Sequence, residues 1–310
     1  MNAYQIVKKD SFRKTPQPMA YTPIPAPEDL IHLDDRGLLA VTGPDAVAFL
    51  QGMVTCDMAK LSPAHSLFGA HLTPQGRMID SFLVYQLGGK IILDCGKDRL
   101  MPLAKSLHHY QMRYNVAFED LSDDYDVFAS LKAHELTAGI TTATENKGIA
   151  VVDPRLVALG SRYILPKGTV KDVHDKLEYH HHRIKLAVPD AHDFIREKTI
   201  AGEYCLEFLN GVDYKKGCYI GQEMTARTHF RTAPKKRVVQ VKYDKIPPEV
   251  GAEIKVGNLK VGNVFSCADG HGIAIVRIAK ALEKGAQLNA EDIPLTAQKP
   301  NWANYDIESQ

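Results

Sequence analysis

HLTPQGRMIDSFLVYQLGGKIILDCG, residues 71–96, is the stretch that decides the fold. Residues 82–87, FLVYQL, form a β-rich run, two glycines follow at positions 88 and 89, and the apolar run resumes through residues 91–93. Two β-rich runs joined by two glycines are typical of an antiparallel hairpin, because the tight turn between them needs positive φ angles. The stretch therefore predicts antiparallel strand pairing in the first half of the chain.

The elements on either side of this hairpin mix strands and helices. We expect a strand at residues 38–41 and then a helix that begins near Pro44 and buries Val47, Leu50 and Val54 on one face. The same patterns predict helices from residue 98 and within 170–186, and strands near 116–122, 125–131 and 161–166. Strands and helices do not alternate as parallel βαβ units do, so the chain is predicted to be an α+β protein.

The two ends of the chain have a different texture. Five prolines fall between positions 16 and 27, which favours extended backbone, so residues 1–29 are predicted to be a tail. After residue 234, short β-rich runs are separated by glycine and asparagine, including Gly257-Asn258, which predicts a small β-barrel. The predicted division is a tail at 1–29, an α+β domain at 30–232, and a barrel with its own tail at 233–310.

Composition narrows the class of protein. The 310 residues carry a formal net charge of +1, which supplies no field for drawing in nucleic acid or an anionic membrane. No apolar run is long enough to span a bilayer, and the N-terminal residues lack the apolar core of a secretory signal. The five cysteines are odd in number and show no CxxC spacing, so reduced thiols are expected. We therefore expect a cytoplasmic protein that enters no membrane.

One cysteine stands in a distinctive setting, KKGCYIGQE at residues 215–223. A helix expected from Gln222 and the two neighbouring lysines would both stabilise a thiolate at Cys218. Free cysteines are also among the most buried residue types, so a structural role in a tight turn is an equally physical interpretation. Residue chemistry alone leaves nucleophile, metal ligand and structural residue as three open alternatives.

The longer stretch DYKKGCYIGQEMTAR, residues 213–227, resembles the K-G-C-[FY]-x-G-Q-E signature of the YgfZ family of folate-binding and iron-sulfur assembly proteins, which are relatives of the glycine-cleavage T-protein. Three earlier segments also resemble the family, in the expected order: VTGPDAVAFLQGMVTCD at 41–57, LTPQGRMIDSFLVY at 72–85 and DPRLVALGSRYIL at 153–165. The resemblance covers the chain from residue 43 to about residue 230.

The resemblance implies a fold and a cofactor. The fold is an aminomethyltransferase-like folate-binding domain of two ferredoxin-like subdomains around a central channel, followed by a small C-terminal β-barrel. The cofactor is tetrahydrofolate or a derivative. The resemblance makes Cys218 the functional thiol. A structural salt bridge is the alternative role for Arg77 and Arg155, which lie outside the signature. The residues expected to bind folate are Lys216, Gly217, Tyr219, Gly221, Gln222, Glu223, Arg227, Arg77 and Arg155.

The chain departs from the T-protein where that enzyme carries paired acids. Asp80 is followed by Ser81, and Arg77 stands where the relative has glycine, so T-protein turnover is not expected and Asp80 is a weak catalytic candidate. A single thiolate supplies one of the four ligands of a [2Fe-2S] cluster, so Cys218 would share a cluster with an A-type iron-sulfur carrier protein. The shared cluster would then support the maturation of client [4Fe-4S] enzymes. The alternatives are a folate-dependent one-carbon transferase and an accessory protein for tRNA modification, with direct nucleic-acid binding not expected.

Overall fold

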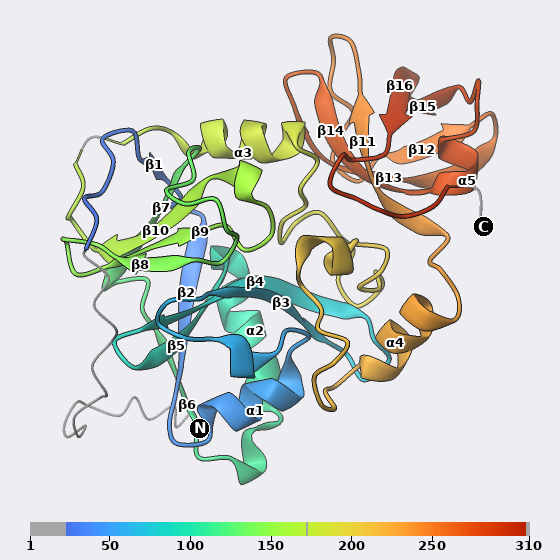
Figure 1. The fold of residues 1–310 in the computed structure, drawn as a ribbon. Coiled ribbons are helices and arrows are strands. Elements are labelled where there is room, and N and C mark those ends of the chain that lie inside the picture. The colour runs from blue at the N-terminus through green and yellow to red at the C-terminus, as the bar shows by residue number, and fades with distance from the viewer. Residues whose placement is uncertain (1–22, 172, 308–310) are drawn as a thin grey trace, which may run out of the picture.

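The computed structural model describes residues 23–171 and 173–307, and within them it builds two antiparallel sheets and a closed barrel (Figure 1). Most of the predicted tail, residues 1–22, lies outside the described residues. The remainder of it runs along the second sheet, where the Ile24 amide donates to the Ala143 carbonyl at 3.0 Å. None of the helices in these two described ranges is long and apolar enough to cross a membrane.

The first sheet has the strand order β3-β4-β5-β2-β6. Its central hairpin is the one predicted from the sequence, since β4 pairs with β5 and both turn glycines, Gly88 and Gly89, have positive φ. Helices α1 and α2 pack against one face of the sheet. The elements are β2 (Arg36–Thr42), α1 (Ala46–Met53), β3 (Leu67–Leu72), β4 (Met78–Leu87), β5 (Lys90–Gly96), α2 (Leu100–His108) and β6 (Ala117–Asp120).

Helix α1 corrects one prediction. It begins just after Pro44 as expected, but it buries Ala46, Phe49, Leu50 and Met53, while Val47 is 51% exposed. The predicted buried face was wrong about Val47, because the side that faces the sheet is set by where the helix lies across β3 and β4, which a 3.6-residue period does not specify.

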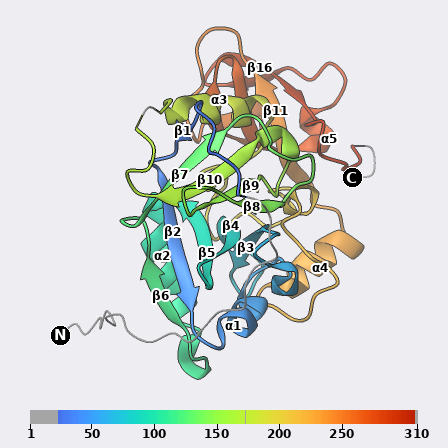
Figure 2. The ribbon, with the colours of Figure 1, turned by 60° about the vertical axis from the view of Figure 1, so that its left-hand side comes forward.

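The second sheet has the order β1-β7-β10-β9-β8, and α3 lies between it and the barrel (Figures 1 and 2). Helix α3 begins where the Asp175 side chain accepts a hydrogen bond from the Leu177 amide at 2.8 Å, as an N-cap does. The predicted strands near 125–131 and 161–166 are confirmed. The elements are β1 (Ile31–His32), β7 (Tyr125–Ser130), β8 (Thr141–Ala143), β9 (Ile149–Val152), β10 (Ser161–Pro166) and α3 (Lys176–Lys185).

The C-terminal strands close into a six-stranded barrel in the order β11-β14-β13-β12-β15-β16. The predicted hairpin at Gly257-Asn258 joins β12 to β13, and the predicted barrel is confirmed. The Trp302 indole donates to the Leu186 carbonyl at 2.8 Å, which ties the end of the chain to α3. The elements are β11 (Lys236–Lys242), β12 (Glu253–Val256), β13 (Leu259–Ala268), β14 (His271–Arg277), α5 (Ile278–Ala281), β15 (Leu288–Ala290) and β16 (Ile293–Gln298).

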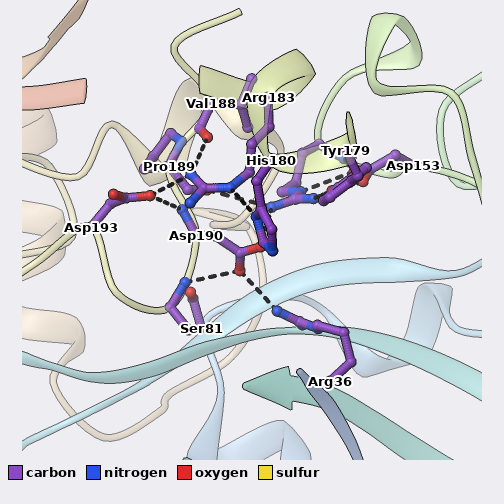
Figure 3. Close-up of polar contacts among 12 residues, drawn as sticks. Arg36, Ser81, Asp153, Tyr179, His180, Arg183, Val188, Pro189, Asp190 and Asp193 are labelled. Carbon is purple, nitrogen blue, oxygen red and sulfur yellow. Dashed lines mark hydrogen bonds and ion pairs between the residues drawn. The ribbon is translucent and has the colours of Figure 1, made fainter. Parts of the chain in front are cut away.

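A buried network of charges joins the two sheets and α3, and it meets the barrel where Arg183 donates to the Ser266 hydroxyl at 3.0 Å. Arg36 on β2 donates to Asp190 at 2.9 Å and to Asp94 at 2.6 Å, and Asp190 lies in the irregular segment that follows α3. In Figure 3, Arg36 approaches from the first sheet and Arg183 from α3. We call this set the buried charge network, and its members are Arg36, Asp94, Asp153, Arg155, Arg162, Tyr179, Arg183, Asp190 and Asp193.

The segment between α3 and α4 (Gln222–Phe230) has no strand, yet it contributes to the main core. Phe194, Tyr204, Leu206 and Leu209 pack there with residues of both sheets and of the barrel. This segment leads to the loop that carries Cys218, so the position of that loop depends on all three units. The predicted division of the chain at residues 30 and 233 stays a prediction.

Candidate functional site

Cys218 is the one exposed thiol among the five cysteines, all of which lie in the described part of the chain. Burial raises the thiol pKa of Cys56 and of Cys205 to about 12, and that of Cys267 to about 11. Those three thiols stay protonated at neutral pH, and Cys95, also buried, has its pKa raised well above its usual value. Cys218 is therefore the sulfur that another molecule can reach.

Lys216 anchors the loop that carries Cys218 to the residues at the end of α1. The Lys216 ammonium is buried, donates to the carbonyls of Val54 at 2.7 Å and of Cys56 at 2.6 Å, and lies 5.0 Å from the centre of the Tyr219 ring. Burial lowers the pKa of Lys216 to about 8. The Ile220 amide also donates to the Gly52 carbonyl at 3.0 Å. Lys216 and Ile220 thus fix the loop to the end of α1 and leave the thiol exposed.

Two glycines bring distant motifs into contact. Gly221, at the N-cap of α4, has φ +81°, and a Cβ there would lie 2.7 Å from the Thr73 carbonyl oxygen. Gly76 has φ +73°, and a Cβ there would lie 2.5 Å from Cβ of Met224. Only glycine permits both this backbone conformation and this approach. The turn at residues 73–77 and the start of α4 therefore pack as one unit, which joins two of the family-like segments.

Helix α4 begins at Gln222, as predicted, and borders an open groove of about 710 Å³. Three of the residues expected to bind folate lie along it. The lining residues are Gln222, Glu223, Ala226, Arg227, Phe230, Arg231 and Thr232. Gly217 is exposed next to Cys218, with nothing within 4 Å of the position of a Cβ.

A second hollow, of about 350 Å³, lies beneath the Cys218 loop, and we call it the inter-sheet cavity. Lys60 and Asp213, on its lining, form an ion pair at 2.5 Å. Its lining joins the segment after α1, β3 of the first sheet, loops next to β8 and β9 of the second sheet, and the segment before the Cys218 loop: Cys56, Asp57, Lys60, His65, Ser66, Leu67, Phe68, Ala138, Pro154, Asn210, Val212 and Asp213. None of the residues expected to bind folate lines this cavity, so their role stays a prediction.

The two arginines outside the signature are occupied by protein partners. Arg155 is buried, donates to both carboxylate oxygens of Asp153 at 3.0 and 2.8 Å and to the Tyr179 hydroxyl at 2.7 Å. Arg77 donates to the Lys198 carbonyl at 2.5 Å. For Arg155 these contacts favour the salt-bridge alternative, and its guanidinium reaches the cavity wall only through the Phe68 ring, 5.6 Å away.

Asp80 is buried in β4 on the face that α1 and α2 cover. Neighbouring residues of a strand point to opposite faces, so Ser81 points the other way and its hydroxyl lies 3.3 Å from that of Tyr204. Burial raises the pKa of Asp80 to about 7, against a hydrogen bond from the Ser81 amide. The carboxyl of Asp80, the acid on β4, therefore faces away from the side on which the paired acid is missing.

This carboxyl predicts a pH dependence of stability. Between pH 4 and 7 the folded chain holds a proton on Asp80 that the unfolded chain, with a pKa near 3.8, has lost, so stability falls as pH rises and the full penalty applies above pH 7. The neighbouring His71 has its pKa lowered to about 4 by burial, so it is neutral over most of this window, and its titration near pH 4 is common to the wild type and the variant. Asp80→Asn is expected to stabilise the protein by roughly 2 kcal/mol at pH 8 and to change nothing at pH 4. Urea unfolding of both proteins at both pH values checks this. A difference in unfolding free energy between the two proteins that is the same at pH 4 and at pH 8 would contradict it.

The buried charge network and the inter-sheet cavity were not anticipated. Arg36, Asp94 and Arg162 do leave a signal, because each is a charged residue set inside or at the end of an apolar strand run. Buried charges are almost always paired, so such positions indicate that partners exist without saying where in the chain they lie.

Comparisons with known proteins agree with this architecture. Residues 235–305 match the family described as CAF17, C-terminal beta-barrel domain. The crystal structure of glycine cleavage system aminomethyltransferase T from Bartonella henselae superposes with a TM-score of 0.71 at 17% identity, over 89% of this chain and 87% of that one. At that identity the likeness shows the fold alone. It confirms the predicted aminomethyltransferase-like α+β domain with a C-terminal barrel.

Two curated relatives are closer in sequence. The human "Iron-sulfur cluster assembly factor IBA57, mitochondrial" is 31% identical over 303 residues, which cover 87% of this chain and 84% of the human protein. The Mycosarcoma maydis homologue is 30% identical, over 78% of this chain and 64% of that protein. Both are named mitochondrial, so the expected cytoplasmic location is wrong: composition and cysteine usage report a reducing compartment and do not separate cytosol from mitochondrion. By its sequence over most of its length, the chain belongs to the IBA57 family of iron-sulfur cluster assembly factors.

Proposed function

We propose that this protein supports the maturation of iron-sulfur enzymes by supplying Cys218 as one ligand of a [2Fe-2S] cluster that a partner also holds. The observation that carries the proposal is the exposure of this single thiol on a loop fixed by Lys216 and Gly221. Within residues 23–171 and 173–307 no three His, Cys, Asp or Glu side chains gather as a metal site. A [2Fe-2S] cluster usually takes four ligands, so the partner, for which we propose an A-type carrier protein, supplies the others.

Tetrahydrofolate is the proposed small-molecule cofactor, and the inter-sheet cavity is the site whose residues fit it. Its volume, about 350 Å³, is at the low end of ligand pockets and suits a bicyclic ring better than a whole folate. Phe68 and Leu67 offer apolar surface, Asp57 offers an acceptor for ring N–H groups, and Lys60 would exchange its ion pair with Asp213 for one with a carboxylate tail. A bound tetrahydrofolate would supply a carrier for one-carbon units.

One-carbon transfer is the less favoured function. The T-protein pattern calls for a second acid at position 81, where this chain has a serine hydrogen-bonded to Tyr204, and Asp80 points to the opposite face of the sheet. Therefore no charged group of β4 lies on the Ser81 face of the sheet, where the T-protein pattern has its second acid. Transfer of a one-carbon unit to tetrahydrofolate by the purified protein, lost in Asp80→Asn, would reverse this preference.

Anaerobic reconstitution tests the ligand role. Wild-type protein mixed with an A-type carrier, iron and sulfide is expected to develop [2Fe-2S] absorption in the visible range that is distinct from that of the carrier alone. Cys218→Ser should remove that difference, whereas the matched control Cys267→Ser, on β13 of the barrel, should preserve it. The same pair of variants is expected to separate in a deletion strain scored by aconitase activity. Full activity with Cys218→Ser would sink the proposal.

A further inference from the structure

The stretch of chain that begins at the Cys218 loop and runs through α4 to the barrel is strongly basic, although the whole chain is nearly neutral. Residues 215–236 contain six lysines and arginines and one acid, Glu223, against a formal net charge of +1 for all 310 residues. Lys216 is buried under the loop, and the other basic residues are exposed or half-exposed: Lys215, Arg227, Arg231, Lys235 and Lys236. Among the described residues none of these five side chains has an ion pair or hydrogen bond, so their charge is free to meet another molecule.

Three aromatic rings pack together at the C-terminal end of α4. The Tyr214 and His229 rings stack with centroids 3.7 Å apart and planes 14° apart, and the Phe230 ring meets both of them edge-on. Phe230 is nevertheless 69% exposed and lines the groove along α4 between Arg227 and Arg231. A rigidly held, exposed phenylalanine flanked by arginines has the composition of a protein-binding hot spot.

We propose that the groove along α4 is the docking surface for an acidic face of a partner protein, which brings that partner's cluster over Cys218. The unpaired arginines supply charge complementarity, and Phe230 supplies an apolar contact between them. Glu223 in the groove lining opposes a uniformly anionic ligand such as a nucleic-acid backbone. The groove begins at Gln222, four residues after the thiol, so a protein seated in it lies next to the sulfur. This inference rests on the proposed function, because it assumes that the partner carries the cluster.

The test measures association with the apo form of the A-type carrier. Arg227→Glu combined with Arg231→Glu is expected to weaken binding at least tenfold, and Phe230→Ala about fivefold. The matched control, Lys242→Glu with Lys284→Glu on the barrel, makes the same charge change and should stay within twofold of wild type. Raising salt from 50 to 300 mM should weaken wild-type binding and leave the α4 charge-reversed variant unchanged.

The outcomes separate this inference from the proposed function. Cys218→Ala is expected to bind the apo carrier like wild type while failing to share its cluster. If the α4 charge-reversed variant binds normally, if wild type does not bind the carrier at all, or if a 20-nucleotide single-stranded RNA binds this surface more tightly than the carrier, the docking surface is overturned. If that variant loses binding while Cys218→Ser still reconstitutes normally, docking stands and the ligand role fails.

Discussion

Asp190→Ala is expected to lower the free energy of unfolding by about 3–5 kcal/mol, because it leaves buried guanidinium groups without a shared counter-charge. Arg36 donates to this carboxylate at 2.9 Å, and an Arg155 nitrogen lies 3.9 Å from it. Although burial alone would raise the pKa of Asp190, the surrounding arginines hold it well below its usual range. The charged form is therefore the one that the fold requires. Urea unfolding at pH 7 measures the loss.

The matched control is Asp34→Ala, which breaks the ion pair with Lys176, where the Asp34 side chain is 57% exposed. That change should cost no more than about 0.5 kcal/mol. Arg36→Met combined with Asp190→Ala should be less damaging than the sum of the two single changes, because each removes a charge that the other left unpaired. Additive losses would show that the two side chains do not act as a pair.

Gly221→Ala is expected to cost about 2–5 kcal/mol and to impair cluster sharing although Cys218 is intact. The methyl group meets the Thr73 carbonyl oxygen at 2.7 Å and Cβ of Leu72 at 2.8 Å, in a backbone conformation that alanine already disfavours. Relief requires the turn at residues 73–77 to separate from the start of α4, which frees the loop that holds the thiol. Urea unfolding gives the stability, and anaerobic reconstitution with the carrier gives the function.

Gly257→Ala separates the cost of the positive φ angle from the cost of the steric contact. Gly257 also has positive φ, at +57°, but nothing lies within 4 Å of the position of its Cβ. It should therefore cost only the conformational penalty of about 1 kcal/mol and leave cluster sharing unchanged. Equal losses in the two variants would mean that the contact between the two glycine-containing segments has no role in holding the site.

Local patterns predicted the parts of the fold that local physics determines. The Gly88-Gly89 and Gly257-Asn258 hairpins and the start of α4 at Gln222 each depend on residues within a few positions, and all three are confirmed. Val47 was misplaced because the sequence of α1 offers two apolar faces that share Leu50, and packing against the sheet selects the one that contains Phe49.

At the site, the functional residue could be predicted from the sequence, but the residues that surround it could not. The resemblance singled out Cys218, and the structure leaves it as the exposed thiol. Neither the inter-sheet cavity nor the buried charge network follows from pattern, because Arg36, Asp94, Asp153 and Asp190 come from four separate segments. Lys216 was expected to contact a ligand, and its ammonium donates to two backbone carbonyls, a structural role that the motif did not reveal, while its ligand role stays a prediction. Matching a motif identifies a residue and does not identify its partners.

The Lys216 anchor also constrains the order of folding. Its two hydrogen bonds join residues 162 and 160 positions apart, to the end of α1 near the start of the domain. Contacts of such high sequence separation bear a large loop-closure entropy and form late, after the elements at both ends are in place. A chain still emerging from synthesis therefore has no assembled thiol loop. Under the proposed ligand role, the loop becomes able to take up a cluster only when the first sheet has folded.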